Sequence, residues 1–305
     1  MASPRRTGTD HRRGAIFNRG TLTLPESVIR EADSQAATGG AILSLGTLTV
    51  VNSSIVNNLG SPAALASLGP LHIARSTIAN NFSDTCGGII ASFGPTTIED
   101  STISRNVSFG IGGGLCLGGT VTIINTTIAN NASDGAGGGL FVFASSTIRL
   151  RLINVTVADN IAGGFSAGSV GGGIFVDEGA DEGATVQLQN TIIARNIAEA
   201  LTGPDCFGSV ISFGNNIIGD TADCSIDLLA SDHVGDAGLG QFVDDERPGG
   251  GRIPLLPASP AIDTGNRQAC PRRDQLQNRR GDGDRDHHKI CDIGAIEFTT
   301  DTDLD

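Results

Sequence analysis

Apolar and polar residues alternate in short runs along the first two thirds of the chain. Residues 48–51 (Leu-Thr-Val-Val) and 121–124 (Val-Thr-Ile-Ile) are typical runs, and they are rich in β-branched residues. This alternation is the pattern of a strand with one buried face, and no window shows a long apolar stripe at helical period. The pattern therefore predicts an all-β chain of many short strands separated by turns rich in Gly, Asn and Ser.

A five-residue phrase, Ser/Thr-Ile-x-x-Asn, divides these runs into units. Its closing asparagines are 23, 25, 25, 29 and 36 residues apart, and Gly-Gly pairs recur in step with them at 39–40, 87–88, 113–114, 138–139 and 172–173. Repeats of this length indicate an array in which each unit is one supersecondary element. We expect a right-handed parallel β-helix of about seven coils over residues 14–219, with about three strands per coil and neighbouring coils ~4.8 Å apart.

The repeated phrase also predicts the inside of the rod. Its second residue should point inward and form one apolar stack, Ile55, Ile78, Ile103, Ile128, Val157 and Ile193. Its closing asparagine should adopt the left-handed backbone of a tight turn and join a ladder of side-chain amides. The predicted ladder is Asn58, Asn81, Asn106, Asn131, Asn160 and Asn196.

The remaining segments differ in composition from the repeats. Residues 1–13 hold the basic cluster Arg5, Arg6, Arg12 and Arg13 in a polar stretch without aromatic residues, which predicts a disordered tail. Residues 220–298 lack the repeat and are expected to form an irregular C-terminal cap, and residues 299–305 an acidic tail.

The C-terminal third carries the most specific resemblance. Gly203-Pro204-Asp205-Cys206, the segment 256–265 (Leu-Pro-Ala-Ser-Pro-Ala-Ile-Asp-Thr-Gly), and 291–297 (Cys-Asp-Ile-Gly-Ala-Ile-Glu) occur in the order seen in choice-of-anchor Q domain proteins. The repeats themselves resemble those of polymorphic outer-membrane proteins within the pectate-lyase-like superfamily. The resemblance implies a secreted or cell-surface bacterial β-helix protein. The segment after Asp274-Gln275 departs from the family pattern, since it reads Leu276-Gln277-Asn278.

The net charge and the hydropathy of the chain limit the classes of partner that we expect. The net charge is −13 over 305 residues, which argues against nucleic-acid binding because that needs a basic footprint. No apolar run reaches the ~18 residues of a membrane span, and the first residues lack the apolar core of a secretory signal. Two explanations stay open: the reading frame is a truncated form of a longer exported protein, or the protein is cytoplasmic and another chain covers its first coil. An uncapped first coil would be an open sheet edge, so we expect association through that end.

The six cysteines fall into two groups. Cys206 and Cys224 are 18 residues apart around a loop, and Cys270 and Cys291 are 21 apart in the predicted cap. Such local pairs in irregular segments fit disulfide bonds of an exported protein. Cys86 aligns with Ile111 in the repeat, five positions before Cys116, and five extended residues span ~16 Å. A disulfide needs Cα atoms within about 7 Å, so both are expected to be small buried apolar residues.

Candidate chemistry is sparse. Asp282, Asp284 and Asp286 have the spacing with which one loop can wrap a calcium ion, although a solvated acidic turn has the same sequence. We expect no other cofactor. The match of residues 164–168 to the nucleophile elbow G-x-S-x-G lies in a Gly-rich loop and is attributed to chance. The lengthened coil holds Asp177, Glu178, Asp181 and Glu182, and in polysaccharide lyases of this fold such residues bind calcium beside a basic arginine or lysine.

Two functions are compatible with these features. The first is a non-catalytic surface or secreted module, adhesin-like or passenger-like, whose partner is an extracellular polysaccharide or another surface component. The second is a carbohydrate-active enzyme of the lyase or hydrolase type, with the acidic loop and the column Arg105, Asp159 and Arg195 as candidates. Regular coils and the lack of a convergent acid and base favour the first, so we assign no catalytic residue.

Overall fold

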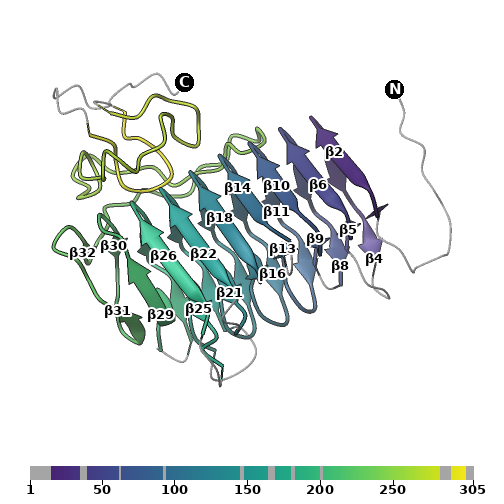
Figure 1. The fold of residues 1–305 in the computed structure, drawn as a ribbon, viewed down its shortest axis with the longest axis horizontal. Helices are drawn as coiled ribbons and strands as arrows, with labels where there is room; N and C mark the ends of the chain where they lie inside the picture. Colours follow the sequence, from purple (N-terminus) through teal and green to yellow (C-terminus); the bar gives the residue numbers. More distant parts are fainter. Residues whose placement is uncertain are drawn as a thin grey trace.

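The chain winds into a rod of stacked coils, seen in a computed structural model in Figure 1. The structure describes residues 15–34, 40–61, 63–91, 94–144, 148–163, 169–179, 183–199, 202–281 and 290–299. Every regular element among them is a β-strand, and all strand pairs of the sheets are parallel. In this part of the chain no helix is present that could cross a membrane. The prediction of an all-β parallel β-helix is confirmed.

Each complete coil contributes one strand to each of four faces, which we call sheets A, B, C and D in chain order. Sheets A and B are two halves of one 16-stranded sheet. Sheet A is β1 (Ile16–Asn18), β5 (Ile42–Ser44), β9 (Leu65–Ser67), β13 (Ile89–Ala91), β17 (Leu115–Leu117), β21 (Leu140–Val142) and β25 (Ile174–Val176). Sheet B is β2 (Thr21–Pro25), β6 (Thr47–Val51), β10 (Leu71–Ala74), β14 (Thr96–Glu99), β18 (Thr120–Ile124), β22 (Arg149–Ile153) and β26 (Thr185–Gln189).

The two halves meet in β29 (Cys206–Ser212), which pairs with β25 at one end and with β26 at the other. Gly208 lies between the two pairings with φ +89°, a conformation that glycine adopts without strain. The short strand β31 (Cys224–Ile226) continues sheet B beyond β29.

Sheets C and D complete the coils. Sheet C is β3 (Val28–Arg30), β7 (Ser54–Val56), β11 (Thr77–Ala79), β15 (Thr102–Ser104), β19 (Thr127–Ala129), β23 (Thr156–Ala158), β27 (Ile192–Ala194), β30 (Ile217–Ile218) and β32 (His233–Val234). Sheet D is β4 (Asp33–Ser34), β8 (Leu59–Gly60), β12 (Phe82–Ser83), β16 (Val107–Ser108), β20 (Ala132–Ser133), β24 (Ile161–Ala162) and β28 (Ile197–Ala198). Seven coils thus carry all four strands, where the sequence predicted about seven coils with three strands each. The strands of sheet D are two residues long, too short for alternation to show.

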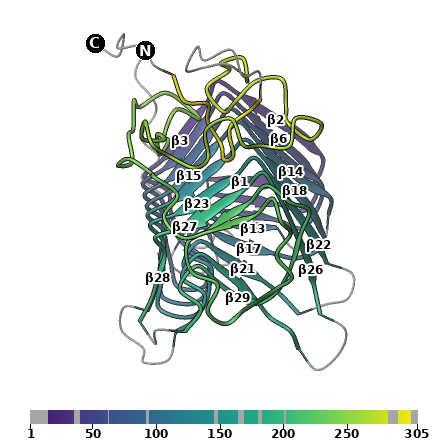
Figure 2. The same cartoon turned by 90° about the vertical axis from the view of Figure 1, so that its left-hand side faces the viewer.

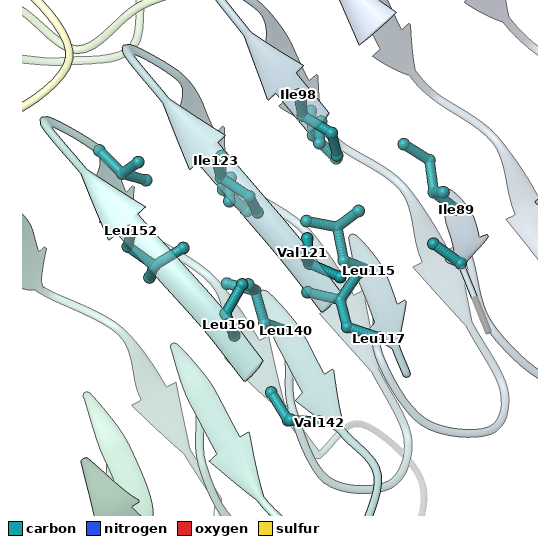
Figure 3. Packing of buried hydrophobic residues seen from close by; sticks show 14 of the residues in the cluster. Ile89, Ile98, Leu115, Leu117, Val121, Ile123, Leu140, Val142, Leu150 and Leu152 are labelled. Carbon is teal, nitrogen blue, oxygen red and sulfur yellow. The ribbon is translucent and has the colours of Figure 1, made fainter. Parts of the chain in front are cut away.

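The interior of the rod is a continuous apolar stack. Ile55, Ile78, Ile103, Ile128 and Val157 are fully buried and lie in register on neighbouring strands of sheet C, as predicted. Figure 3 shows the matching stacks from sheets A and B, such as Leu115 beside Leu140 and Ile123 beside Leu152. Burying each of these side chains contributes about 1.5–3 kcal/mol, so stability is spread evenly over the coils.

The segment predicted as a cap does more than cover the last coil. Residues 237–281 and 290–299, here called the strap, turn back over sheet C and the edge of sheet B (Figures 1 and 2). The threonines of sheet C anchor it: Gly249 N–H donates to Thr77 Oγ1 (2.8 Å), Thr102 Oγ1 donates to Gly251 O (2.7 Å), and Ala295 N–H donates to Thr156 Oγ1 (3.0 Å).

A second apolar core forms beneath the strap. The outward residues of sheet C are small or aliphatic there, and they pack against aliphatic residues of the strap. The residues of this core are Ala129, Ala158, Ile192, Ala194 and Ile217 from the rod, and Ala237, Leu239, Ile253, Leu255, Ala261 and Ile293 from the strap.

Candidate functional site

The turn between sheets C and D brings the predicted site column to the surface. Its outward residues are Asn57, Asn80, Arg105, Asn130, Asp159 and Arg195, one per coil, and all have φ between 54° and 60°. This corrects the prediction that the closing asparagine of each repeat adopts the left-handed conformation. The residue before it does so, and this turn directs the closing asparagine into the rod.

The closing asparagines form the ladder that the sequence predicts. In each step the Nδ2 of one asparagine donates to the Oδ1 of the next, from Asn58 and Asn81 (2.9 Å) to Asn160 and Asn196 (2.9 Å). The backbone N–H of Asn58 donates to the same Asn81 oxygen (3.0 Å), and the later rungs repeat this bond. All six asparagines are buried, so the ladder satisfies the polar groups of the turn inside the rod.

The ladder ends in a carboxylate that the sequence reasoning missed. Asp205 Oδ1 accepts the N–H and the Nδ2–H of Asn196 (3.0 and 2.8 Å), and its Oδ2 accepts the N–H of Asp220 (2.8 Å). A carboxylate has only acceptors, so it ends the ladder without leaving a donor unpaired. Burial raises the pKa of Asp205 to about 6, against the hydrogen bonds from Asn196. The sequence signal was the position of Asp205, just after Gly203-Pro204 and before Cys206.

A second ladder runs through the turn between sheets B and C. The N–H of Ser27 donates to Ser53 Oγ (2.9 Å), and the N–H of Ser53 donates to Ser76 Oγ (3.1 Å). The ladder is interrupted at Val155, which has no side-chain acceptor, and beyond it the N–H of Thr191 donates to Asn216 Oδ1 (2.9 Å). It also ends in a carboxylate, because Asp232 Oδ1 accepts the N–H of Asn216 (2.9 Å). Both ladders therefore run in the same direction and close at the same end of the rod.

The strap turns part of the outward C–D column into a shallow cleft of about 470 Å³. We call it the C–D cleft. Its lining is Arg105, Asn130, Asp159 and Arg195 from the rod, with Gln241 and Phe242 from the strap. Sequence reasoning found Arg105, Asp159 and Arg195 but not Asn130, Gln241 or Phe242. Nothing in the repeat indicates where the strap returns.

Ion pairs fix the geometry of the C–D cleft. Arg195 Nη2 lies 2.7 Å from Asp159 Oδ2, and its Nη1 donates to the carbonyl oxygens of Leu239 (2.8 Å) and Gly240 (2.9 Å). Arg105 Nη1 lies 3.1 Å from Asp244 Oδ2, and its guanidinium stands 4.9 Å from the centre of the Phe242 ring. The two arginines are therefore matched by two carboxylates. The arrangement offers a polar surface with an aromatic wall, which suits binding.

The predicted acidic loop lies elsewhere. Asp177 and Glu178 follow β25, at the connection between sheets A and B, where Glu178 Oε1 accepts the hydroxyl of Ser209 (2.7 Å). Asp181 and Glu182 lie outside the described residues, as does the segment 164–168. The structure therefore does not bring Asp177 and Glu178 together with Arg105, Asp159 and Arg195, since the two groups occupy different connections of the coil.

All six cysteines are paired. Cys206 is bonded to Cys224 (Cα–Cα 5.1 Å) and Cys270 to Cys291 (6.4 Å), in the predicted pairs. Cys86 is bonded to Cys116 (6.2 Å), so the expectation of two unpaired cysteines is wrong. The repeat alignment holds, because Gly87 N–H donates to Gly112 O. The error lay in treating the residues before Cys116 as extended: Gly112 has φ +56° and folds the chain back.

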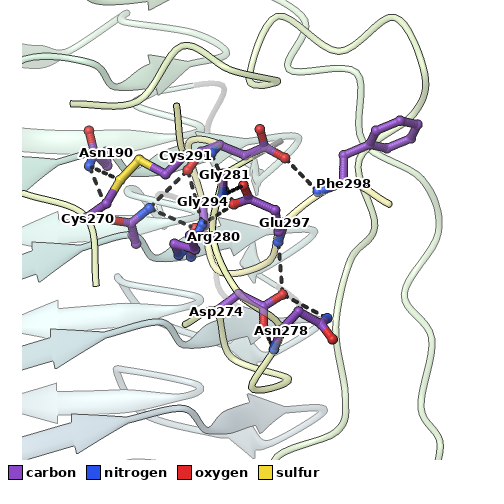
Figure 4. A network of polar contacts seen from close by, with 12 residues as sticks. Asn190, Cys270, Asp274, Asn278, Arg280, Gly281, Cys291, Gly294, Glu297 and Phe298 are labelled. Atoms are coloured by element: carbon purple, nitrogen blue, oxygen red, sulfur yellow. Dashed lines mark hydrogen bonds and ion pairs between the residues drawn. A yellow bond between two sulfur atoms is a disulfide. The ribbon is translucent and has the colours of Figure 1, made fainter. Parts of the chain in front are cut away.

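A buried charged cluster holds the strap together (Figure 4). The Arg280 guanidinium is almost fully buried, lies 3.1 Å from Glu297 Oε2, and donates to the carbonyl oxygen of Gly294 (2.7 Å) and to Asn125 Oδ1 (3.0 Å). Asp274 and Asp292 complete the cluster and are both buried.

The protonation of this cluster follows from its burial. Burial raises the pKa of Asp292 to about 7, helped by the nearby Glu297. Burial also raises the pKa of Glu297, although the Arg280 charge acts in the opposite direction. One guanidinium faces three carboxyl groups here, so we interpret the cluster as the anchor of the strap.

The calcium prediction stays a prediction, because Asp282, Asp284 and Asp286 lie outside the described residues. Within the described part of the chain, no group of three or more His, Cys, Asp or Glu residues has the arrangement of a metal site.

Comparison with known proteins identifies the family. No curated protein and no solved structure matches the chain. The family model described as right-handed β-helix region matches residues 15–182, which is more than half of the chain. That range covers the first six complete coils and the first strand of the seventh, up to the loop that follows β25. The chain therefore belongs to the family of right-handed β-helix proteins.

Proposed function

We propose that the chain is a non-catalytic β-helix module that is exported and binds a ligand at the cell surface, as an adhesin or a passenger domain does. The observation that carries the proposal is the pairing of charges in the C–D cleft. Three donor positions of Arg195 are engaged by Leu239, Gly240 and Asp159. Acid–base catalysis needs a group that is free to exchange a proton with the substrate, and these groups are committed to each other.

The disulfides support export. Three pairs in one chain are typical of proteins that mature in an oxidising compartment. The resemblance to choice-of-anchor Q domain proteins supports the same location. The ligand would be an extracellular polysaccharide or a component of another surface, with Phe242 and the neighbouring polar side chains of the C–D cleft as the contact surface.

The enzyme alternative is tested with a polysaccharide panel that includes polygalacturonate and alginate, with and without calcium. We expect no release of unsaturated or reducing sugars. Release that Arg195→Ala abolishes would contradict the proposal. Arg149→Ala is the matched control, because Arg149 is exposed on the outer face of sheet B, away from the cleft.

The binding role is tested on the same panel in immobilised form, together with intact cell surfaces. Retention should fall for the double variant Phe242→Ala, Asn130→Ala and stay unchanged for Arg149→Ala. Retention that is equal in all three proteins would show that the C–D cleft is not the contact surface.

A further inference from the structure

Sheet D carries an exposed apolar stripe that the proposed function does not use. The first residue of each sheet D strand points outward, and from the second coil onward these residues are Leu59, Phe82, Val107, Ala132, Ile161 and Ile197. They lie in register on neighbouring strands, so the six form one row. Five coil steps make the row about 24 Å long. We call it the D stripe.

The D stripe inverts the usual pattern of a sheet over a core. The inward residue of each sheet D strand is small and buried, namely Gly60, Ser83, Ser108, Ser133, Ala162 and Ala198. The large apolar residue faces out instead: Ile161 is 37% exposed and Ile197 53%, and the adjoining Phe109, which packs edge-on against Phe82, is 52% exposed. A continuous apolar row that the rod's own interior does not need is typical of an interaction surface.

The strap does not supply the missing cover. It packs on sheet C, whose outward residues include Ala129, Ala158 and Ala194, whereas β28 lies on a flank that the strap leaves open (Figure 2). The outward faces of two neighbouring sheets therefore differ: small or aliphatic residues lie under the strap on sheet C, whereas the strap does not cover the apolar residues of sheet D.

The C–D column beside the D stripe indicates what the stripe can contact. Coil by coil, this column reads Asn80, Arg105, Asn130, Asp159 and Arg195. If a second copy lies antiparallel on the stripe, with the two-fold axis at the coil of Asn130, Arg105 of each copy comes level with Asp159 of the other. Within each chain Arg105 is already paired with Asp244 and Asp159 with Arg195, so this register avoids contact between like charges without supplying a new ion pair. Moving the axis by one coil places Arg105 or Asp159 opposite its own copy, which is repulsive.

The same axis matches the shapes of the apolar residues. It sets Phe82 opposite Ile197 and Val107 opposite Ile161, so each larger group meets a branched aliphatic one. At the axis Ala132 faces its own copy, and this small side chain lets the two sheets approach closely. A two-fold contact must be complementary to itself in this way.

We propose that the D stripe is a homodimer interface in which two rods pack antiparallel with the two-fold axis at Ala132. The row is only one residue wide and is flanked by polar residues, so the area falls short of the about 800 Å² per partner of standard stable complexes. We therefore expect weak self-association that appears at high protein concentration.

The register is tested by cysteine trapping in the full chain, whose six native cysteines are all paired. Ala132→Cys should form a disulfide-linked dimer on mild oxidation. Val107→Cys and Ile161→Cys should each stay largely monomeric alone and form a mixed dimer when combined. Thr122→Cys is the control, because Thr122 is half-exposed on the outer face of sheet B in the same coil. Trapping of Thr122→Cys as fast as Ala132→Cys would overturn the proposal.

Equilibrium sedimentation provides an independent readout. The native chain should exceed its monomer mass of 31.1 kDa at high concentration, and Ile197→Asp should weaken this association by at least about tenfold because the dimer would bury a charge. Ile197 is exposed, so the variant should fold normally. A native chain that stays monomeric would refute the proposal. Association that is unchanged by Ile197→Asp would also refute the proposal and would indicate that the chains associate through the first coil. If the native chain is monomeric and binds lipid vesicles, and Ile197→Asp loses this binding, the D stripe is a lipid-binding surface instead.

Discussion

The rod and the strap are stabilised in opposite ways. In the rod most coils repeat the same modest contributions: a few buried aliphatic side chains, an asparagine rung and a hydroxyl rung. In the strap the polar stabilisation is concentrated in one cluster around Arg280, whose guanidinium joins Glu297, Gly294 and Asn125. In a repeated structure the stability is spread over many equivalent residues, whereas in an irregular one it depends on a few single residues. Loss of one hydrogen-bonded side chain from a ladder should destabilise the rod only near that coil. Loss of one charge from the Arg280 cluster should detach the strap from the rod.

The largest effect on stability is expected from a charged residue placed in the apolar interior of the rod. Ile128→Asp places an unpaired charge among stacked aliphatic residues, at a position with no exposure. We expect a loss of about 4 kcal/mol or more and an unfolded rod. Circular dichroism and urea unfolding measure this, with Thr122→Asp on the outer face of the same coil as the control. A cooperatively folded Ile128→Asp protein would contradict the inward direction of this residue.

A nearly equal effect is expected in the strap, but it should be confined there. Arg280→Met leaves Glu297, Asp292 and Asp274 without their cation, and removing one partner of a buried ion pair costs about 3–5 kcal/mol. Hydrogen exchange should show lost protection at 290–299 while the interior of sheet C stays protected. Arg247→Met removes an exposed arginine of the same strap and should change little. Equal loss of protection in strap and rod would show that they unfold together.

A smaller effect is expected from the disulfide that links two coils. Replacing Cys86 and Cys116 by alanine removes a cross-link that closes a 30-residue span, which is worth about 2–4 kcal/mol. The melting temperature should fall, and β13 and β17 on either side should exchange faster than distant coils. Peptide mapping of the non-reduced native chain should find the three pairs Cys86–Cys116, Cys206–Cys224 and Cys270–Cys291. Free thiols at Cys86 and Cys116 would exclude the cross-link.

The smallest expected effect is a pH dependence at the end of the rod. The pKa of Asp205 is about 6 in the fold and 3.8 when unperturbed, so the folded state binds more protons between these values. The contribution of Asp205 to stability is fully present below pH 3.8 and is lost as the pH rises through 6, a change of about 2–3 kcal/mol.

Asp205→Asn removes the titrating group and should flatten this part of the stability curve. Urea unfolding of both proteins from pH 4 to pH 7 gives the comparison, and the contribution of Asp292 cancels because it is present in both. Parallel curves would show that Asp205 does not titrate in this range.

Much of the rod could be predicted because the same interactions recur at equivalent positions of successive coils. The period of the Thr-Ile-x-x-Asn phrase placed Ile128 in the interior and Asn131 in the ladder, since stacking forces equivalent positions into register. The errors arose where the chain departs from extended geometry. The fold-back at Gly112 brought Cys116 to Cys86, and the left-handed residue proved to be the fourth of the phrase, as at Arg105.

The strap could not be predicted for a different reason. Many of its contacts join residues more than 130 positions apart, such as Gly249 with Thr77 and Ala295 with Thr156. No periodicity encodes such pairs, and a threonine on the outer face of a strand has the same sequence signature whether it meets water or a returning segment. The C–D cleft was therefore half predicted: its rod residues follow from the repeat, whereas Gln241 and Phe242 follow from the path of the strap.

The strap also has a consequence for the evolution of the rod. An array of identical coils can gain or lose a unit at little cost, because each coil contacts only its neighbours. The strap removes that freedom: it grips Thr77, Thr102, Thr127 and Thr156 on four successive coils with donors and acceptors at fixed places along its own chain. An inserted or deleted coil within this span would move the threonines out of step. The strap thus fixes the number of coils between Thr77 and Thr156.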